Sequence, residues 1–225
     1  MRIDAICQST GYSDMLALTL PQNKGFFDSI MVYTKRGDEP TKAVCAKERI
    51  ACEETDRFTQ NGSVFNRGAV YNEAFRYHLL RRWGSGEGRQ WFCIIDSDII
   101  LPPGFRDTLE VMEENGSLET ECFYGARRWN VETMEQYEQV RRGGDDAMKG
   151  LTLFRGYGYG YLQLFRARSS TFVRLWNETK GNPYLEWRDG SWADCAFRLN
   201  WGDCPWNPPT QPPDNILDHT VPEPV

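Results

Sequence analysis

The stretch that decides the fold is Trp91-Phe92-Cys93-Ile94-Ile95-Asp96-Ser97-Asp98, an apolar run that ends abruptly in two carboxylates. Five successive apolar residues favour a central strand covered on both faces, as in a mainly parallel sheet between helices. Ligand sites in open α/β sheets lie outside the carboxyl ends of such strands, so both carboxylates are expected there. Because residues two apart in extended backbone project to the same side, Asp96 and Asp98 are expected to converge on one hard cation.

Short apolar runs alternate with helical patterns on both sides of this strand, which is typical of a βαβ architecture. Ser13 is expected to cap the first helix and Pro21 to end it. Strands are expected at 3–7, 30–33, 50–52, 122–126 and 161–165, and helices at 14–20, 41–47, 68–82, 105–115, 131–142, 171–180 and 192–200. The pattern therefore predicts one mixed α/β domain over residues 1–225.

Composition excludes several classes of protein. The 26 Lys+Arg against 32 Asp+Glu give a net charge of −6, and no basic cluster is longer than a pair such as Arg81-Arg82, which argues against a nucleic-acid partner. No apolar stretch is long enough for an integral membrane segment, and Met1–Asp4 lacks a signal-peptide pattern. The seven cysteines are scattered without a CxxC pair, so we expect reduced thiols and a cytoplasmic location.

Two segments of the first half resemble the GT-A glycosyltransferases, especially their family-2-like members. Residues 92–102 look like the D-x-D segment of that family. Residues 55–58 and 65–72, the latter reading Phe-Asn-Arg-Gly-Ala-Val-Tyr-Asn, resemble its "FNKG…N" segment, with Arg67 where many members have Lys. The resemblance covers roughly residues 3–110 and implies a GT-A (Rossmann-like), mixed, mainly parallel sheet flanked by helices in a single domain. Residues 1–105 would bind the nucleotide-sugar, and residues 106–225 would form the acceptor side and tail.

The resemblance also implies roles for individual residues. Asp98 would ligate the metal directly, and Asp96 would contact the ribose or the metal through water. Arg67 would reach the diphosphate or the base, and Asn66 would shape the turn before the helix. The other nucleotide-sugar contacts implied are Gln8, Ser9, Thr10, Thr34, Thr55, Asp56 and Ser97. The four hydroxyl residues Ser9, Thr10, Thr34 and Thr55 fit caps and turns equally well.

Two residues of the second half complete the candidate site. His219 matches the late histidine that GT-A enzymes often use as a third metal ligand, although a surface histidine explains it as well. Asp194 matches the carboxylate that inverting members place at the start of a late helix as the catalytic base. Ala193 replaces the first of the usual acidic pair, Ser191-x-x-Asp194 is also a capping box, and Asp189 is the alternate base.

The sequence thus predicts a metal-dependent glycosyltransferase of the hexosyltransferase type, using Mn²⁺ or Mg²⁺ and inverting the anomeric centre. The expected donor is a nucleotide-diphosphate-sugar, a UDP-sugar first and a GDP-sugar as the alternative, and the acceptor is a glycan or another hydroxyl compound. Trp129, Trp187 and Trp192 offer stacking faces for an acceptor sugar, or else core packing. The competing functions are a nucleotidyltransferase and a non-catalytic carbohydrate- or nucleotide-binding domain.

Overall fold

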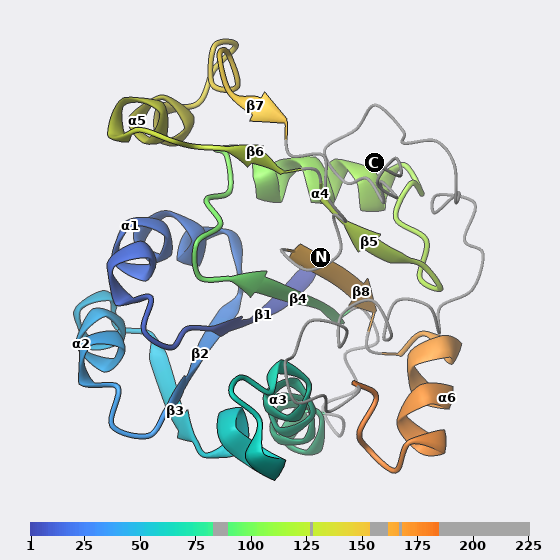
Figure 1. Ribbon diagram of the computed structural model, residues 1–225. Helices are drawn as coiled ribbons and strands as arrows, with labels where there is room; N and C mark the ends of the chain where they lie inside the picture. Colours follow the sequence, from blue (N-terminus) through green and yellow to red (C-terminus); the bar gives the residue numbers. More distant parts are fainter. Residues whose placement is uncertain (83–89, 127, 154–161, 167, 185–225) are drawn as a thin grey trace, which may run out of the picture.

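A six-stranded sheet runs through the computed structural model, which describes residues 1–82, 90–126, 128–153, 162–166 and 168–184 (Figure 1). Its strands are β1 (Arg2–Gln8), β2 (Ser29–Lys35), β3 (Ala51–Thr55), β4 (Gln90–Asp96), β5 (Phe123–Gly125) and β8 (Leu162–Arg166). The spatial order is β3-β2-β1-β4-β8-β5. The first four strands are parallel, whereas β8 runs antiparallel to both β4 and β5. The expected mixed, mainly parallel, Rossmann-like sheet is confirmed, and it takes strands from both halves of the chain.

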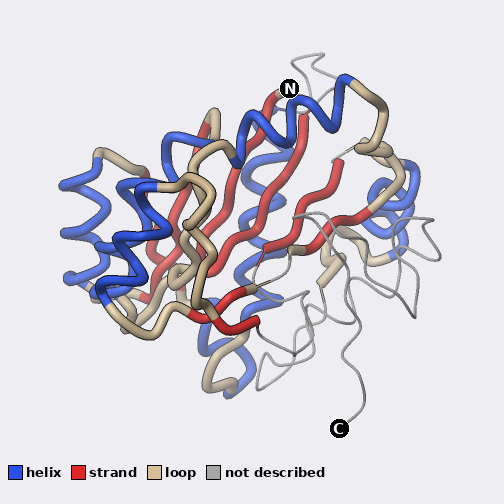
Figure 2. The backbone as a smooth tube through the Cα atoms, turned by 90° about the horizontal axis from the view of Figure 1, so that it is seen from above, coloured by secondary structure: helices blue, strands red, loops and turns tan. Residues whose placement is uncertain are grey.

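Helices cover both faces of this sheet, as the view from above shows (Figure 2). They are α1 (Ser13–Asn23), α2 (Glu39–Glu48), α3 (Arg67–Arg82), α4 (Phe105–Glu114), α5 (Met134–Arg142) and α6 (Ser170–Glu178), with short 3₁₀ turns η1 (Lys24–Phe26) and η2 (Arg57–Gly62). One apolar core joins α1, α2 and α4 to the face of Ala5 and Cys93. A second, rich in aromatic rings, joins α3 and α6 to the face of Ile6 and Phe92. Side chains alternate between the two faces along each strand and so contribute to both cores, which is why residues 91–95 of β4 are all apolar.

Three local expectations were wrong. Tyr12 rather than Ser13 precedes α1, with no side-chain cap, and the helix continues past Pro21 to Asn23. The last turn holds because the Asn23 side chain donates to Ile99 O at 2.6 Å and accepts from Leu101 N at 2.9 Å. Helix α5 begins three residues later than expected because Thr133 and Gln136 form a capping box.

Two short strands flank α5, one before it and one after it. Strands β6 (Trp129–Asn130) and β7 (Thr152–Leu153) pair antiparallel as a separate two-stranded sheet, which the sequence pattern did not predict. In Figure 1, α5 lies at the upper left above α1, and β6 and β7 lie next to it. The helix expected at 192–200 lies outside the described residues.

The cysteines among the described residues are of two kinds. Cys7, Cys45, Cys52 and Cys93 are free thiols, as expected. Cys122 is disulfide-bonded, so the expectation of a wholly reduced chain is wrong at that position. Free thiols fit a reducing compartment and a disulfide fits an oxidising one, so the cytoplasmic location stays a prediction. Among the described residues, no helix is both long enough and apolar enough to cross a bilayer.

Candidate functional site

The candidate site lies where the order of the parallel strands reverses, between β1 and β4. Strands β2 and β3 follow β1 on one side, whereas β4 returns to its other side, so β1 and β4 flank a topological switch point. In the parallel register, Gln8 pairs with both Tyr33 of β2 and Asp96 of β4. Their side chains therefore share one face at the carboxyl edge of the sheet, where ligands of open α/β folds bind.

The N-terminus of α3 brings a cation to this edge. Asn66 caps the helix by accepting a hydrogen bond from Ala69 N at 3.0 Å. Arg67 forms an ion pair with Asp96 and donates to the Tyr71 hydroxyl at 3.0 Å, and its guanidinium lies 5.8 Å from the centre of the Tyr71 ring. Gln8 Nε2 in turn donates to Arg67 O at 3.0 Å. Helix N-terminus and guanidinium together make this edge attractive to an anion.

Four polar atoms at the carboxyl ends of β1 and β2 are buried and have no hydrogen-bond partner. They are Gln8 Oε1, Ser9 Oγ, Thr10 Oγ1 and the Tyr33 hydroxyl. Gln8, Ser9 and Tyr33 are only 5%, 2% and 1% exposed, and burial raises the pKa of the Tyr33 hydroxyl, helped by Glu53 and Glu73. A buried polar atom without a partner costs free energy, about 1–3 kcal/mol each. Four of them at the end of two adjacent strands therefore point to a polar ligand.

Asp38, which the sequence analysis did not select, supports the loop that carries these atoms. Its Oδ2 accepts from Gly11 N at 3.1 Å, from the Thr34 hydroxyl at 2.9 Å and from the Thr41 hydroxyl at 2.9 Å. Burial raises the pKa of Asp38, but these hydrogen bonds outweigh burial and hold it below its ordinary value. The pattern Asp38-x-x-Thr41 at the start of a helix could have identified this residue, because Asp38 is also the N-cap of α2.

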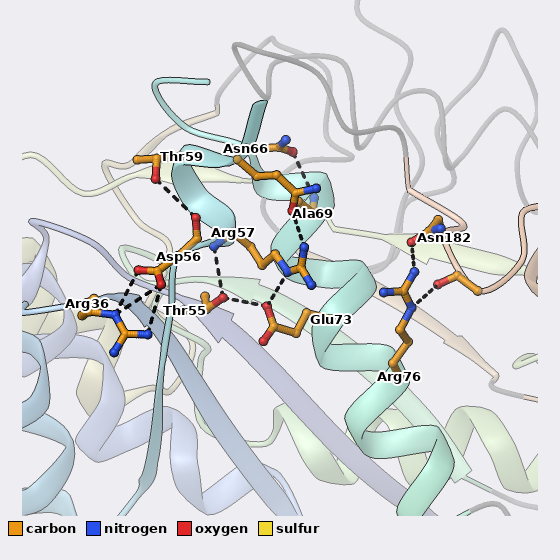
Figure 3. Close-up of polar contacts among 12 residues, drawn as sticks. Arg36, Thr55, Asp56, Arg57, Thr59, Asn66, Ala69, Glu73, Arg76 and Asn182 are labelled. Carbon is orange, nitrogen blue, oxygen red and sulfur yellow. Dashed lines mark hydrogen bonds and ion pairs between the residues drawn. The ribbon is translucent and has the colours of Figure 1, made fainter. Parts of the chain in front are cut away.

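Thr55 and Asp56 line a second, strongly charged cavity of about 470 Å³. Figure 3 shows the polar contacts of these two residues. Thr55 donates to Glu73 Oε2 at 2.6 Å and accepts from Arg57 N at 3.1 Å. Asp56 forms a two-point ion pair with Arg36, with N–O distances of 3.0 and 3.1 Å. Both side chains are 70% exposed, so this pair is worth little stability. The hydroxyls of Thr34 and Thr55 are thus both used within the protein, whereas those of Ser9 and Thr10 are not.

The geometry of the D-x-D segment differs from expectation. Strand β4 ends at Asp96, and Ser97 and Asp98 form a turn closed by Ile99 N donating to Asp96 O at 3.2 Å. Same-side projection therefore does not apply, because it requires extended backbone. Asp98 is exposed, whereas Ser97 is buried and its carbonyl accepts from the Thr19 hydroxyl at 2.7 Å.

Both carboxylates still lie near the end of β1. Burial, followed by the charges of Asp96 and Asp98, raises the pKa of the Cys7 thiol. No cluster of three or more His, Cys, Asp or Glu ligands occurs within the described residues. Two carboxylates suit Mg²⁺ or Mn²⁺ when phosphate oxygens and waters complete the shell, so the residues present fit a metal of that kind. His219, Asp194 and the alternate base Asp189 lie outside the described residues.

The site also contains residues that spacing alone did not reveal. Tyr71 orients Arg67 through its hydroxyl and its ring, and Tyr33 places an unpaired hydroxyl at the end of β2. Tyr71 stands four residues after Arg67 on a helix, a spacing that puts the two side chains on one face and that could have signalled the contact. Nothing in the local sequence distinguishes Tyr33 from a core aromatic residue.

Comparison with known proteins gives a likeness of fold and no family. No protein-family model and no curated protein matches the chain. Among solved structures, it is similar to a glucosyl-3-phosphoglycerate synthase from Mycobacterium tuberculosis in complex with uridine-diphosphate (12% identity, 98% of this chain and 87% of that one, TM-score 0.43). It is also similar to a 4-diphosphocytidyl-2C-methyl-D-erythritol synthase (13%, 74% and 75%, 0.41) and to a mannose-6-phosphate isomerase from Helicobacter pylori (11%, 80% and 75%, 0.39). At these values the likeness assigns no activity, so the site is interpreted from its own geometry.

Proposed function

We propose that the protein is a glycosyltransferase that moves a sugar from a nucleotide-diphosphate-sugar to an acceptor hydroxyl, with inversion. The observation that carries the proposal is the group of four buried, unpaired polar atoms at the ends of β1 and β2. The amide oxygen of Gln8 is an acceptor and the three hydroxyls are donors or acceptors, a set that matches the polar edge of a nucleobase and its ribose. A UDP-sugar is the first choice of donor and a GDP-sugar the second.

The diphosphate of the donor would lie beside Arg67. The guanidinium is 18% exposed and sits at the first residue of a 16-residue helix, where positive potential from the helix adds to its own charge. Asp96 holds this guanidinium in place through their ion pair. Asp98, with Asp96 and His219, would hold Mn²⁺ or Mg²⁺, which would neutralise charge on the leaving diphosphate.

Transfer itself needs a base and an acceptor. The acceptor hydroxyl oxygen would bond to the anomeric carbon while the bond from that carbon to the diphosphate breaks and its electron pair leaves with the nucleoside diphosphate. We assign the hydroxyl proton to the Asp194 carboxylate, with Asp189 as the alternate.

A nucleotidyltransferase is the competing function, and one contact speaks against it. Such enzymes use backbone N–H groups of an early glycine-rich loop to hold phosphates. Here the loop after β1 has Gly11 as its one glycine, and Gly11 N donates to Asp38 at 3.1 Å. That N–H is therefore already used within the protein.

Ser9→Ala tests the binding edge because its effects on stability and on affinity are expected to differ. The Ser9 hydroxyl has no partner, so its loss should leave the melting temperature unchanged or slightly higher. Affinity for UDP, measured by calorimetry with Mn²⁺, should fall about tenfold, since a hydrogen bond to the ligand disappears. The matched control is Ser169→Ala, whose buried hydroxyl caps α6 by accepting from Phe172 N at 3.1 Å. It should lower the melting temperature and leave UDP affinity unchanged.

Product analysis then distinguishes the three functions. Wild-type protein with Mn²⁺ should slowly hydrolyse its preferred nucleotide-sugar to a nucleoside diphosphate, because water replaces the acceptor. Pyrophosphate released from a nucleoside triphosphate and a sugar phosphate would favour the nucleotidyltransferase instead. Tight donor binding without any nucleoside diphosphate, even with acceptors present, would favour a binding domain.

A further inference from the structure

A cavity of about 850 Å³ opens beside Asp98, on the face of the sheet that carries α1 and α4. Its walls come from α1, from residues 98–105 that follow β4, and from the segment 128–151 that contains β6 and α5. Figure 1 shows α5 next to α1, and the Tyr137 hydroxyl of α5 donates to Leu18 O of α1, although more than one hundred residues separate the two helices in the sequence. Volumes of about 300–1,000 Å³ are typical of sites for small organic ligands.

The floor and the rim of this cavity are hydrocarbon. Leu101, Phe105 and Leu162 at its floor are 4%, 2% and 1% exposed. Met15, Met134 and Met148 also line it, yet they are 42%, 56% and 38% exposed. Three of the six methionines of the chain thus gather at one cavity with their side chains in water. Exposed apolar groups that cluster in this way mark binding sites, and methionine suits ligands of varied shape.

The hydroxyl groups in the wall are already used within the protein. The Thr19 hydroxyl donates to Ser97 O at 2.7 Å, and the Tyr137 hydroxyl donates to Leu18 O at 2.7 Å. Thr133 Oγ1 accepts from Gln136 N at 3.2 Å as part of the cap of α5. The lining also includes Asp98, Arg128, Asn130 and Glu132, but most of its side chains are apolar. The cavity therefore suits a ligand with an apolar body better than a glycan.

We infer that this cavity binds the acceptor, and that the acceptor is an alcohol or phenol with an apolar body. The inference rests on the proposed function, which puts the donor sugar beside Asp98. Asp98 lines the cavity, so the hydroxyl of a molecule seated on the methionines would face the anomeric carbon, with the hydrocarbon body against Phe105 and Leu101. The sequence predicted a glycan or any other hydroxyl compound as the acceptor, and this cavity restricts the proposed acceptor to an aryl or alkyl alcohol.

The test uses 2-naphthol, a fluorescent phenol that serves both as a ligand and as an acceptor. The variant Met15→Glu/Met134→Glu makes the rim charged at two exposed positions in the first turns of α1 and α5, where a carboxylate suits the helix. The matched control Val64→Glu/Val111→Glu adds the same charge at side chains that are 90% and 57% exposed and do not line the cavity. Melting temperatures of all three proteins verify folding.

Wild type and the control should bind 2-naphthol, and the rim variant should bind it at least tenfold more weakly. In transfer assays kcat/KM for 2-naphthol should exceed that for methyl glucoside at least tenfold, and the rim variant should lose this preference while it still hydrolyses the donor. Methyl glucoside as the better acceptor, equal 2-naphthol affinity in the rim variant, or no binding to wild type would overturn the inference. If the proposed function is wrong, the protein does not bind UDP. If UDP and 2-naphthol both bind but no transfer occurs, the acceptor role alone is overturned.

Discussion

Replacing Asp38 by Ala should destabilise the protein by about 3 kcal/mol. The helix cap of α2 disappears, which costs about 1 kcal/mol. The hydroxyls of Thr34 and Thr41, both fully buried, lose their acceptor, at about 1 kcal/mol each. For a chain of 225 residues, each kcal/mol shifts the melting temperature by about 2–4 °C. The expected fall is therefore about 6–12 °C.

Glu39→Ala is the matched control for this change. Glu39 is the next residue, lies in the first turn of α2, and pairs with Lys42 at 2.9 Å on the surface. An exposed pair of this kind is worth less than about 1 kcal/mol. UDP affinity should also fall in Asp38→Ala, because Gly11 N loses its acceptor and the loop of Ser9 and Thr10 is no longer held. Equal melting temperatures of Asp38→Ala and Glu39→Ala would refute the reasoning.

The Asp38 prediction has a pH dependence with a definite sign. The pKa of Asp38 in the folded protein lies below its ordinary value of 3.8. A group of this kind contributes stability above its unfolded pKa and loses it as the pH falls through the folded pKa. The stability difference between wild type and Asp38→Asn, from urea unfolding, should be full above about pH 5 and narrow below about pH 4. A constant difference down to about pH 3 would show that the charge of Asp38 is not what the hydrogen bonds stabilise.

Four further substitutions test other parts of the site. Asp98→Asn should leave the melting temperature unchanged, because the side chain is exposed, and it should abolish the Mn²⁺-dependent part of UDP binding. Asp96→Asn should weaken UDP binding less, and it also removes the ion pair with Arg67. Calorimetry that finds the same metal dependence in Asp98→Asn would remove Asp98 from the metal site. Asp194→Asn should lower turnover by roughly 10²–10⁴-fold with donor affinity kept, and near-normal turnover would shift the base to Asp189. Tyr137→Phe breaks the hydrogen bond from α5 to Leu18 O, so it should cost about 1 kcal/mol in urea unfolding; exposed Tyr12→Phe is the control, and equal losses would show that the bond contributes nothing.

Most elements of the sheet and its helices could be predicted because their signals are local. The run 91–95 favours a strand buried on both faces, and Val70, Ala74 and Phe75 mark the buried side of α3 at helical spacing. The errors occurred where a distant contact outweighed a local preference. Pro21 fails to end α1 because Asn23 is tied to the segment 99–101, which no pattern near residue 21 can reveal.

In the candidate site, too, some features could be predicted from local sequence and others depend on distant contacts. The sequence alone predicts that polar side chains follow β1, β2, β3 and β4, because strand ends and polar residues can be recognised within one segment at a time. Only the tertiary structure decided which of these groups are already used: Thr34 and Thr55 bond to carboxylates, whereas Ser9 and Thr10 have unpaired oxygens. It also decided that Asp98 lines the methionine-lined cavity, whereas Asp96 is paired with Arg67. Hydrogen-bond satisfaction and cavity walls depend on residues far apart in the chain, and those are brought together only by folding.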